Sequence, residues 1–416
     1  MSHSAALDRR MYLRTNREQI GERAYLDYSA VTPIDREVLE IMLPYFDRRY
    51  GNPSSIHADG RRSRAAIEES RSLIAALIGA KADEIIFTGS GTESDNLALI
   101  GCARANRERG NHLIISAIEH KAVLEAARVL SKEGFVVSVL PVNGAGMIDI
   151  EECLRLVTPR TILVSVMYVN NEIGTVLPLQ KLSEALQKSH RDEFPLLHTD
   201  ACQASNLFPI RPRELGVDLL SVNSSKLYGP LGAGFLYRRT GVNLSPLLVG
   251  GEQEKNLRAG TESVPTIVGF SRAFSKSQAL REAEYARLAS LSRYFADELL
   301  TRIPTATRNG DPLAQSPAIV HISVPDVEGE SMLLKLDSAG ISVSTGSACS
   351  AFDLRPSHVL LAIGQDPELV HGSIRFSLGR GTTKEELDRV LEVFPGIVRE
   401  LLSLSALTTR HATATL

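Results

Sequence analysis

The sequence predicts an α/β protein with a mainly parallel central sheet in a large domain, followed by a smaller C-terminal α+β domain. Two observations lead to this prediction. Short runs rich in Val, Ile and Leu alternate with amphipathic helical stretches until about residue 266, where one long helical stretch begins. Uniformly apolar runs are typical of strands that are buried on both faces, as in parallel sheets covered by helices. The chain of 416 residues is long enough for two such domains.

Seven apolar runs are predicted to form the strands of the large domain. They are EIIF at 84–87, HLIIS at 112–116, VVSVL at 136–140, TILVSVM at 161–167, PLLHT at 195–199, DLLSV at 218–222 and GFLY at 234–237. Helical patterns lie between many of them, at 93–108, 120–133 and 179–189. This alternation of strand and helix favours a parallel sheet.

The change of pattern marks the predicted start of the smaller domain. A helical stretch covers 267–303, and SIRFSL and KEELDRVLEVFPGIVRELL follow it as a strand and a helix. The predicted division has four parts: an N-terminal extension at 1–24, a large domain at 25–275, a small domain at 276–405 and a flexible tail at 406–416. Packing of the first residues of the large domain against the small domain is compatible with this division.

Composition and charge exclude several classes of function. The net charge of −3 gives no strong electrostatic case for binding nucleic acid, and no apolar run is long enough to span a membrane. The N-terminus has no apolar segment of the kind that directs secretion, so we expect a cytoplasmic protein. Four scattered cysteines without a CxxC pair argue against a disulfide framework and against a metal site; they are Cys102, Cys153, Cys202 and Cys349.

The stretch TGSGTESDNLALIG at 88–101 is the first candidate for a ligand site. Small residues precede a helix start at Thr92, and loop N–H groups beside a helix start can bind a phosphate. A tight turn with an ordinary helix cap explains the same residues, so both interpretations stay open.

The stretch PLLHTDACQA at 195–204 is the second candidate. Asp200 follows a predicted strand, and ligands in open α/β sheets bind at the carboxyl ends of the strands. Asp200 could pair with a cationic ring nitrogen, with Gln203 close by, or it could simply cap a helix.

Lys226 is the third candidate, because it directly follows the predicted strand at 218–222. A lysine that is partly removed from water has a lowered pKa and becomes a nucleophile toward carbonyl groups. The alternative is an ordinary lysine whose amine reaches solvent.

In combination, the motifs of this chain are similar to those of a known enzyme family. They are YLDYSAVTPID (25–35), YGNPSSIHADG (50–60), TESDNLALIG (92–101), EHKAVL (119–124), VNNEIGTV (169–176), HTDACQ (198–203), SKLYGPLG (225–232), GGEQEKNLRAGTESVP (250–265), STGSACSAFDLRPSHVLLAIG (344–364) and SIRFSLGR (373–380). This order of motifs resembles the cysteine desulfurases of the NifS/IscS type. Those are class V aminotransferases of the fold-type I group, which use pyridoxal phosphate (PLP). The resemblance runs from residue 25 to about residue 400.

The resemblance implies a role for each matching residue. Lys226 would carry the cofactor covalently, Asp200 would keep its ring nitrogen protonated, and Gln203 would bond its phenolic oxygen. His120 would stack on the ring and relay protons. The residues around it, taken without the resemblance, indicate an ordinary surface histidine. The residues implied around the phosphate are Gly91, Thr92, Asn223, Ser225 and, from across a homodimer interface, Thr261. Asn171, beside the cofactor, and Arg375 would hold the substrate carboxylate.

Cys349 would be the residue that accepts sulfur. Its thiolate would take the sulfur of L-cysteine as a persulfide and leave L-alanine. The spacing from Cys349 to RPSHVL matches family members with a longer, mobile loop, which hand sulfur to a partner protein. That partner would serve iron–sulfur cluster assembly, tRNA thiolation or DNA sulfur modification, with no direct contact to nucleic acid or membrane.

Several positions depart from the usual family pattern and keep other functions open. Ser225 stands where histidine is common, Asn223 where Ser or Thr is usual, and Leu231 replaces a lysine in the following turn. The alternatives are a selenocysteine lyase, another fold-type I enzyme such as an aminotransferase, and a non-catalytic relative.

Overall fold

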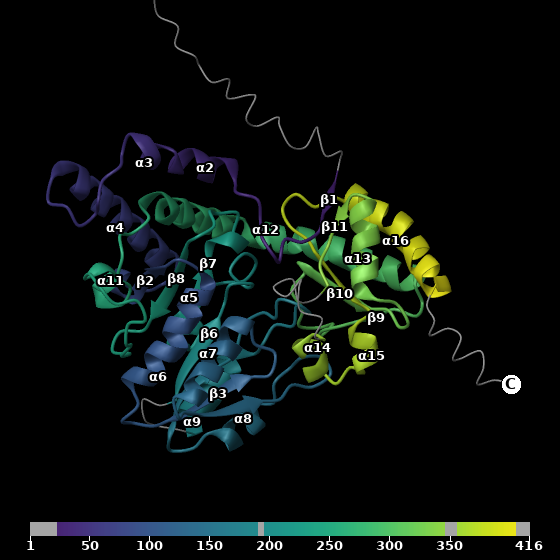
Figure 1. Cartoon of the computed structure of the whole chain (residues 1–416), viewed down its shortest axis with the longest axis horizontal. Coiled ribbons are helices and arrows are strands. Elements are labelled where there is room, and N and C mark those ends of the chain that lie inside the picture. Colours follow the sequence, from purple (N-terminus) through teal and green to yellow (C-terminus); the bar gives the residue numbers. More distant parts are fainter. Residues whose placement is uncertain (1–22, 190–194, 346–355, 405–416) are drawn as a thin grey trace, which may run out of the picture.

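The computed structural model describes residues 23–189, 195–345 and 356–404. They form two bodies, one built on a seven-stranded sheet and one on a three-stranded sheet, and the long helix α12 (Val264–Arg302) runs between them (Figure 1). Among the described residues no helix combines the length and the apolarity that a membrane crossing requires.

The larger body contains all seven predicted strands. In chain order they are β2 (Ile85–Thr88), β3 (His112–Ser116), β4 (Val136–Leu140), β5 (Thr161–Ser165), β6 (Leu196–Asp200), β7 (Leu219–Asn223) and β8 (Gly234–Arg238). Across the sheet the order is β2-β8-β7-β6-β5-β3-β4. Five neighbouring strands run parallel, from β7 to β4, whereas β8 is antiparallel to both β7 and β2. The predicted mainly parallel sheet is confirmed.

The details of the sheet correct three expectations. Asp200 belongs to strand β6 itself, although the strand was expected to end one residue earlier. Strand β5 ends at Ser165, short of the predicted end at 167. Burial on both faces is wrong for β4, since this strand lies at the edge of the sheet and its side chains Val136 and Val139 are exposed.

Helices cover the large sheet. They are α4 (Ala58–Ile78), α5 (Gly91–Asn96), α6 (Cys102–Ala105), α7 (Lys121–Lys132), α8 (Ile150–Leu156) and α9 (Leu179–Ser189). The helix expected at 93–108 begins earlier, contains a π-helical turn at Leu97–Gly101, and ends at Ala105. The side chain of Asn106 donates to the carbonyl of Cys102 and so closes that end. Shorter elements are α2 (Arg36–Met42), α3 (Pro44–Asp47), α10 (Pro212–Leu215), α11 (Gln253–Asn256) and the 3₁₀ turns at Ala82–Glu84 and Ser224–Lys226.

The smaller body is built on an antiparallel sheet with the order β12-β10-β9. Its elements are β9 (Thr307–Arg308), β10 (Ile319–Ser323), α13 (Gly329–Ser338), β11 (Ile341–Ser342), α14 (His358–Ala362), α15 (Pro367–Val370), β12 (Ser373–Ser377) and α16 (Lys384–Leu404). Edge-to-face contacts join Phe295, Phe376 and Phe394 in its core.

The start of the described chain also belongs to the smaller body. Strand β1 (Ala24–Tyr25) pairs in parallel with β11, and Leu26 is fully buried in the same core (Figure 1). Helix α12 begins at Val264, three residues before the expected start, and packs on α4 at one end and on α16 at the other. The predicted domain boundary at 275/276 therefore falls inside one continuous helix.

Candidate active site

The candidate site is a cavity of about 310 Å³ at the carboxyl ends of the parallel strands. Asp200 ends strand β6, Asn223 ends the neighbouring strand β7, and Lys226 follows in the next turn. Arg375 enters the same cavity from strand β12 of the smaller body. The two bodies therefore build one cavity together.

Nine of the twelve site residues expected from the sequence line this cavity. They are Gly91, Thr92, His120, Asn171, Asp200, Gln203, Asn223, Lys226 and Arg375. Ser225 lies in the same turn as Lys226 but is not part of the lining, and Thr261 is exposed on a loop elsewhere. Cys349 lies outside the described residues.

Lys226 projects from a 3₁₀ turn that the N-terminal segment braces. The backbone N–H of Thr32 donates to the carbonyl of Ser225 over 2.9 Å, and its hydroxyl donates to the same oxygen over 3.0 Å. The ammonium of Lys226 donates to the carbonyl of Ala30, and the lysine is half-buried. These contacts hold the amine at the cavity wall.

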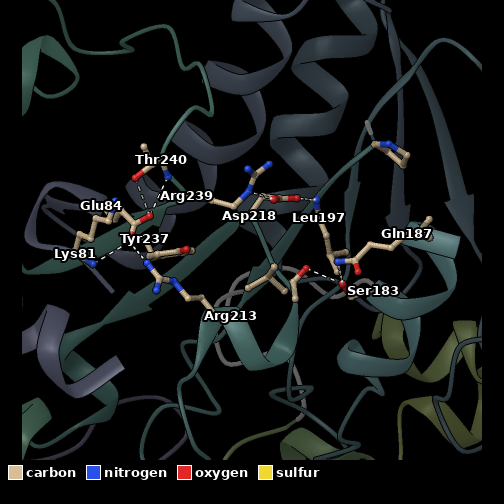
Figure 2. Close-up of a pocket in the computed structure, with 14 residues that line it drawn as sticks. Lys81, Glu84, Ser183, Gln187, Leu197, Arg213, Asp218, Tyr237, Arg239 and Thr240 are labelled. Atoms are coloured by element: carbon tan, nitrogen blue, oxygen red, sulfur yellow. Dashed lines mark hydrogen bonds and ion pairs between the residues drawn. The ribbon is translucent and has the colours of Figure 1, made fainter. Parts of the chain in front are cut away.

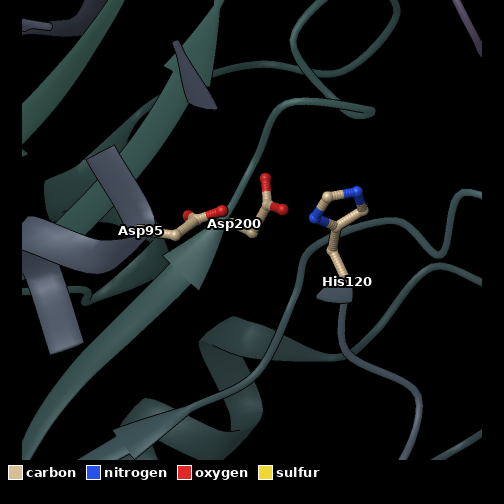
Figure 3. Close-up of side chains that lie close together, drawn as sticks. All are labelled: Asp95, His120 and Asp200. Carbon is tan, nitrogen blue, oxygen red and sulfur yellow. The ribbon is translucent and has the colours of Figure 1, made fainter. Parts of the chain in front are cut away.

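Asp200 stands between a second buried carboxyl group and an imidazole (Figure 3). One ligand atom each of Asp95, His120 and Asp200 lies within 4.8 Å of the other two. The Oδ1 of Asp200 accepts from the backbone N–H of Cys202 over 2.8 Å, and the chain after it forms turns rather than a helix. The alternative that Asp200 caps a helix is therefore wrong.

Burial disfavours the charged forms of the groups behind Asp200. Burial raises the pKa of Asp95 well above its usual value, and the charge of Asp200 raises it further. Burial also lowers the pKa of His198 to about 4, and its ring lies 3.7 Å from Asp95 Oδ1. Asp200 and Asp95 both line the cavity, and Asp200 is the one on the side of His120 (Figure 3).

The residues at the other end of the cavity fit a phosphate group. Ser90 caps α5, because its side chain accepts the N–H of Glu93 over 3.1 Å. Gly91 and Thr92 lie in the first turn of this helix, where backbone N–H groups have no acceptor within the helix itself. A Cβ atom on Gly91 would lie 2.7 Å from the sulfur of Cys202, so only glycine leaves this space open. Nδ2 of Asn223, which can donate to a phosphate oxygen, lies 3.3 Å from the same Cβ position.

Arg375 is almost fully buried, and its guanidinium is held by two acceptors. Nη1 donates to the carbonyl of Asn171 over 2.7 Å, and Nη2 donates to Asp27 Oδ1 over 3.0 Å. The Nε–H is buried and has no partner in the described part of the chain. A guanidinium with an unused N–H can donate it to a carboxylate that binds in the cavity.

His120 caps helix α7 through its ring. Nδ1 accepts the backbone N–H of Ala122 over 3.1 Å, so the neutral ring carries its proton on Nε2. The preceding Glu119 is fully buried and accepts from the hydroxyl of Ser116 and the N–H of Met167. Burial raises the pKa of Glu119 to about 8.

Several cavity residues were not predicted from the sequence. Asp95 lies within the quoted TESDN motif, and His358 lies within RPSHVL, but neither was given a role. Asp95 has polar neighbours in the sequence, Ser94 and Asn96, so nothing in the sequence set it apart. Glu172, directly after Asn171, also lines the cavity and is buried.

A second cavity of about 560 Å³ lies at the other ends of the strands, beside the amino ends of β6 and β7 (Figure 2). Its two carboxyl groups are saturated by contacts within the chain. Glu84 accepts from the N–H groups of Lys81 and Thr240, and Asp218 accepts from the N–H of Leu197 and from Arg239. These contacts connect strands to loops, so the carboxyl groups serve the structure of the chain rather than a ligand.

The chain is similar to known proteins over most of its length. A family model described as aminotransferase class-V matches residues 24–390. A protein of Dictyoglomus turgidum named cysteine desulfurase IscS is 48% identical over 381 residues, which cover 92% of this chain and 96% of the relative. A solved structure titled NifS-like protein matches with a TM-score of 0.85 and 34% identity, over 91% of this chain and all of the other. A structure titled SspA in complex with cysteine matches with a TM-score of 0.75 and 32% identity, over 85% and 98% of the two chains.

Proposed function

The chain belongs to the cysteine desulfurases of the class-V aminotransferase family, and from this membership we propose that it converts L-cysteine to L-alanine and collects the sulfur as a persulfide on Cys349. The observation that carries the proposal is the meeting of Lys226, Asp200, His120 and Arg375 around one cavity. A lysine at the end of a strand, a carboxylate on the next strand and a buried arginine are the groups needed to bind an aldehyde cofactor and an amino acid.

Pyridoxal phosphate fits the residues of the cavity. Lys226 would hold it covalently, Asp200 would face its ring nitrogen, Gln203 would bond its phenolic oxygen and His120 would stack on the ring. The phosphate would lie against Gly91, Thr92, Asn223 and Ser225, where the space beside Gly91 and the donor Nδ2 of Asn223 next to that space support the assignment. When bound, the cofactor supplies an electron sink that stabilises negative charge at carbon atoms next to the substrate nitrogen.

The chain itself would bind and orient the substrate. Asn171 and Arg375 would hold the carboxylate of cysteine, and the unused Nε–H of Arg375 supports this role. The Cys349 thiolate would attack the sulfur atom of the bound cysteine. A bond between the two sulfur atoms forms, the carbon–sulfur bond of the substrate breaks, and the carbon takes up a proton to give alanine. The persulfide would then pass to an acceptor protein for iron–sulfur cluster assembly, tRNA thiolation or DNA sulfur modification.

A homodimer is part of the proposal. Apolar side chains that a monomer would rarely show to water lie on segment 43–56 and on a loop at Val249; Phe46, Tyr50 and Ile56 are each more than 60% exposed. Thr261 is also exposed, as a residue that reaches a partner's phosphate must be. Light scattering on the purified chain tests the dimer. We place the activity in the cytoplasm, where free thiols persist.

The test of the function uses the purified protein loaded with pyridoxal phosphate. Cysteine and a reductant should give sulfide and alanine in equal amounts. Cys349→Ala should abolish both products, whereas the control Cys153→Ala, which removes a buried thiol outside the cavity, should retain them. Alanine production that survives in Cys349→Ala would show that this cysteine is not the sulfur acceptor. Lys226→Ala should lose the covalent attachment of the cofactor and its yellow absorbance band.

A further inference from the structure

Two side chains at the start of α14 reach across from the smaller body to the larger one. The hydroxyl of Ser357 donates to Glu172 Oε2 over 2.5 Å, and Nε2 of His358 lies 2.9 Å from the carbonyl oxygen of Glu119. Each partner is next in sequence to a residue of the active-site cavity, since Glu119 precedes His120 and Glu172 follows Asn171. These two bonds place the imidazole of His358 in the wall of the cavity.

The partner of His358 fixes where its proton lies. A carbonyl oxygen can only accept, so Nε2 of His358 must carry the hydrogen of this bond. The neutral ring then has a lone pair on Nδ1, and no donor among the described residues is bonded to that atom. His358 is only half-buried and lines the cavity, so Nδ1 is the ring nitrogen that remains for a ligand.

His120 has the opposite arrangement. Its Nδ1 is taken up by the backbone N–H of Ala122, and its neutral ring carries the hydrogen on Nε2. Neutral His120 can therefore donate a hydrogen bond into the cavity, but it has no spare lone pair with which to take up a proton. The cavity thus has one imidazole that donates and one that accepts.

The substrate of the proposed function needs such an acceptor. An amino acid arrives at neutral pH with an ammonium group, and it must lose one proton before its nitrogen can act as a nucleophile. The cavity of about 310 Å³ is small, so an amino acid held through its carboxylate by Arg375 lies close to every wall. The other charged or titratable groups around it are Asp95, Glu119, His120, Lys121, Glu172, Asp200, Cys202, Lys226 and Arg375.

We propose that His358 is an acid–base residue of this site, whose Nδ1 accepts a proton from the ammonium group of the incoming amino acid. The N–H bond of the ammonium breaks, its electron pair stays on the substrate nitrogen, and the proton forms a new bond to Nδ1. The resulting imidazolium keeps its Nε2–H on the carbonyl of Glu119, and the positive charge of the ring strengthens this hydrogen bond. The inference rests on the proposed function for the identity of the substrate.

The first test concerns the ring itself and needs neither cofactor nor substrate. In the protein labelled with ¹⁵N-histidine, the His358 signal is assigned by its loss in His358→Gln. Above pH 8 this signal should show a protonated Nε2 and an unprotonated Nδ1. The opposite tautomer would overturn the proposal.

The second test follows the reaction of the amine directly. L-Alanine has no thiol, yet its amine should still change the absorbance of the bound cofactor, and stopped-flow mixing gives the rate. His358→Gln keeps a side-chain N–H for the Glu119 carbonyl and removes the imidazole lone pair. We expect this rate to fall about 10²-fold at pH 7, the lower range for general acid–base catalysis. The defect should shrink as the pH approaches 9.5, because more alanine then arrives as the free amine.

The controls separate this inference from the proposed function. His371→Gln changes an exposed histidine of the same body and should leave the rate unchanged. A His358→Gln rate equal to wild type, or a defect of constant size at every pH, contradicts the acid–base role. If alanine reacts as expected but cysteine yields no sulfide, the proposed function fails and the role of His358 stands. If wild type shows no absorbance change with alanine, both fail.

Discussion

Arg71 and Glu254 form a two-pronged ion pair in the interior of the larger body. Nη1 lies 2.8 Å from Oε2 and Nη2 lies 2.6 Å from Oε1, and both side chains are nearly inaccessible to water. Oε2 also accepts the backbone N–H of Phe87. Glu254 and the next two residues, Lys255 and Asn256, all have left-handed backbone conformations, which are unfavourable for residues other than glycine. The ion pair therefore anchors a strained turn in the loop that leads to the exposed Thr261.

Removing the charge of Glu254 should destabilise the protein strongly. We expect Glu254→Gln to lower the free energy of unfolding by about 3–5 kcal/mol, because Arg71 would stay buried without its buried countercharge. Glu68 is a second, half-exposed partner of the same arginine, and Glu68→Gln should cost less than about 1 kcal/mol. Urea denaturation followed by circular dichroism measures both variants. Equal losses in the two would contradict the special role of the buried pair.

Closing the space beside Gly91 should weaken binding of the cofactor. The new methyl group of Gly91→Ala would lie 2.7 Å from the sulfur of Cys202 and 3.3 Å from Nδ2 of Asn223, in the region assigned to the phosphate. We expect the dissociation constant of pyridoxal phosphate, measured by absorbance titration of the apoprotein, to rise about 10-fold or more, which corresponds to about 1.4 kcal/mol.

Gly396→Ala is the matched control for this change. Gly396 lies within helix α16, and a Cβ atom there would meet nothing within 4 Å. This variant should bind the cofactor like wild type and should gain about 0.5–1 kcal/mol of stability, because alanine favours the helix. An unchanged affinity in Gly91→Ala would argue against a phosphate at this position.

Much of the site could be predicted because its residues follow apolar strands. Asp200 and Asn223 end neighbouring parallel strands, and such strand ends meet at one edge of a sheet. Asp95 could not be predicted, since its motif indicates only a helix start and its burial depends on packing against strands far away in the sequence. The role of His358 was also hidden, because its bond to the Glu119 carbonyl depends on how the two bodies pack together.

Arg375→Lys should weaken substrate binding without affecting the cofactor. Lysine keeps the positive charge, but it lacks the planar guanidinium. The guanidinium donates to the carbonyl of Asn171 and to the carboxylate of Asp27, and its Nε–H remains for the substrate. We expect the KM for cysteine to rise about 10-fold or more, equivalent to the loss of one charge-assisted hydrogen bond.

The control for this variant is Arg287→Lys. Arg287 donates to the carbonyl groups of Thr382 and Gly379 away from the cavity, so its loss should leave the KM unchanged. The dissociation constant of pyridoxal phosphate should be that of wild type in both variants. A lowered affinity for the cofactor in Arg375→Lys would show that the arginine supports the cofactor rather than the substrate.

The three cysteines within the described residues should be unreactive in the folded protein. Cys102, Cys153 and Cys202 are all buried. Burial raises the pKa of Cys102 and of Cys153 to about 12, and it raises the pKa of Cys202 well above its usual value. In Cys349→Ala, a chromogenic thiol reagent at pH 8 should label almost nothing before denaturation and three thiols after it. Rapid labelling of the native variant would contradict this burial.

His321 should make the protein sensitive to acid. The ring is fully buried on β10, opposite Arg375 on β12, and its Nδ1 accepts from the side-chain amide of Asn309 over 2.8 Å. Burial and, to a smaller extent, the charge of Arg375 together lower its pKa to about 3. The neutral ring is thus the form that the folded protein holds.

Since the folded pKa is below the unfolded value of about 6.5, the unfolded chain binds more protons between these two values, and stability falls as the pH falls through that window. From pH 7 to pH 4 this single group should cost about 3 kcal/mol. His321→Gln should lose less stability over that range than wild type by about this amount, whatever its stability at pH 7. The exposed-residue control His371→Gln should follow wild type. Urea denaturation at a series of pH values measures the difference, and parallel curves for His321→Gln and wild type would mean that His321 takes up its proton without unfolding.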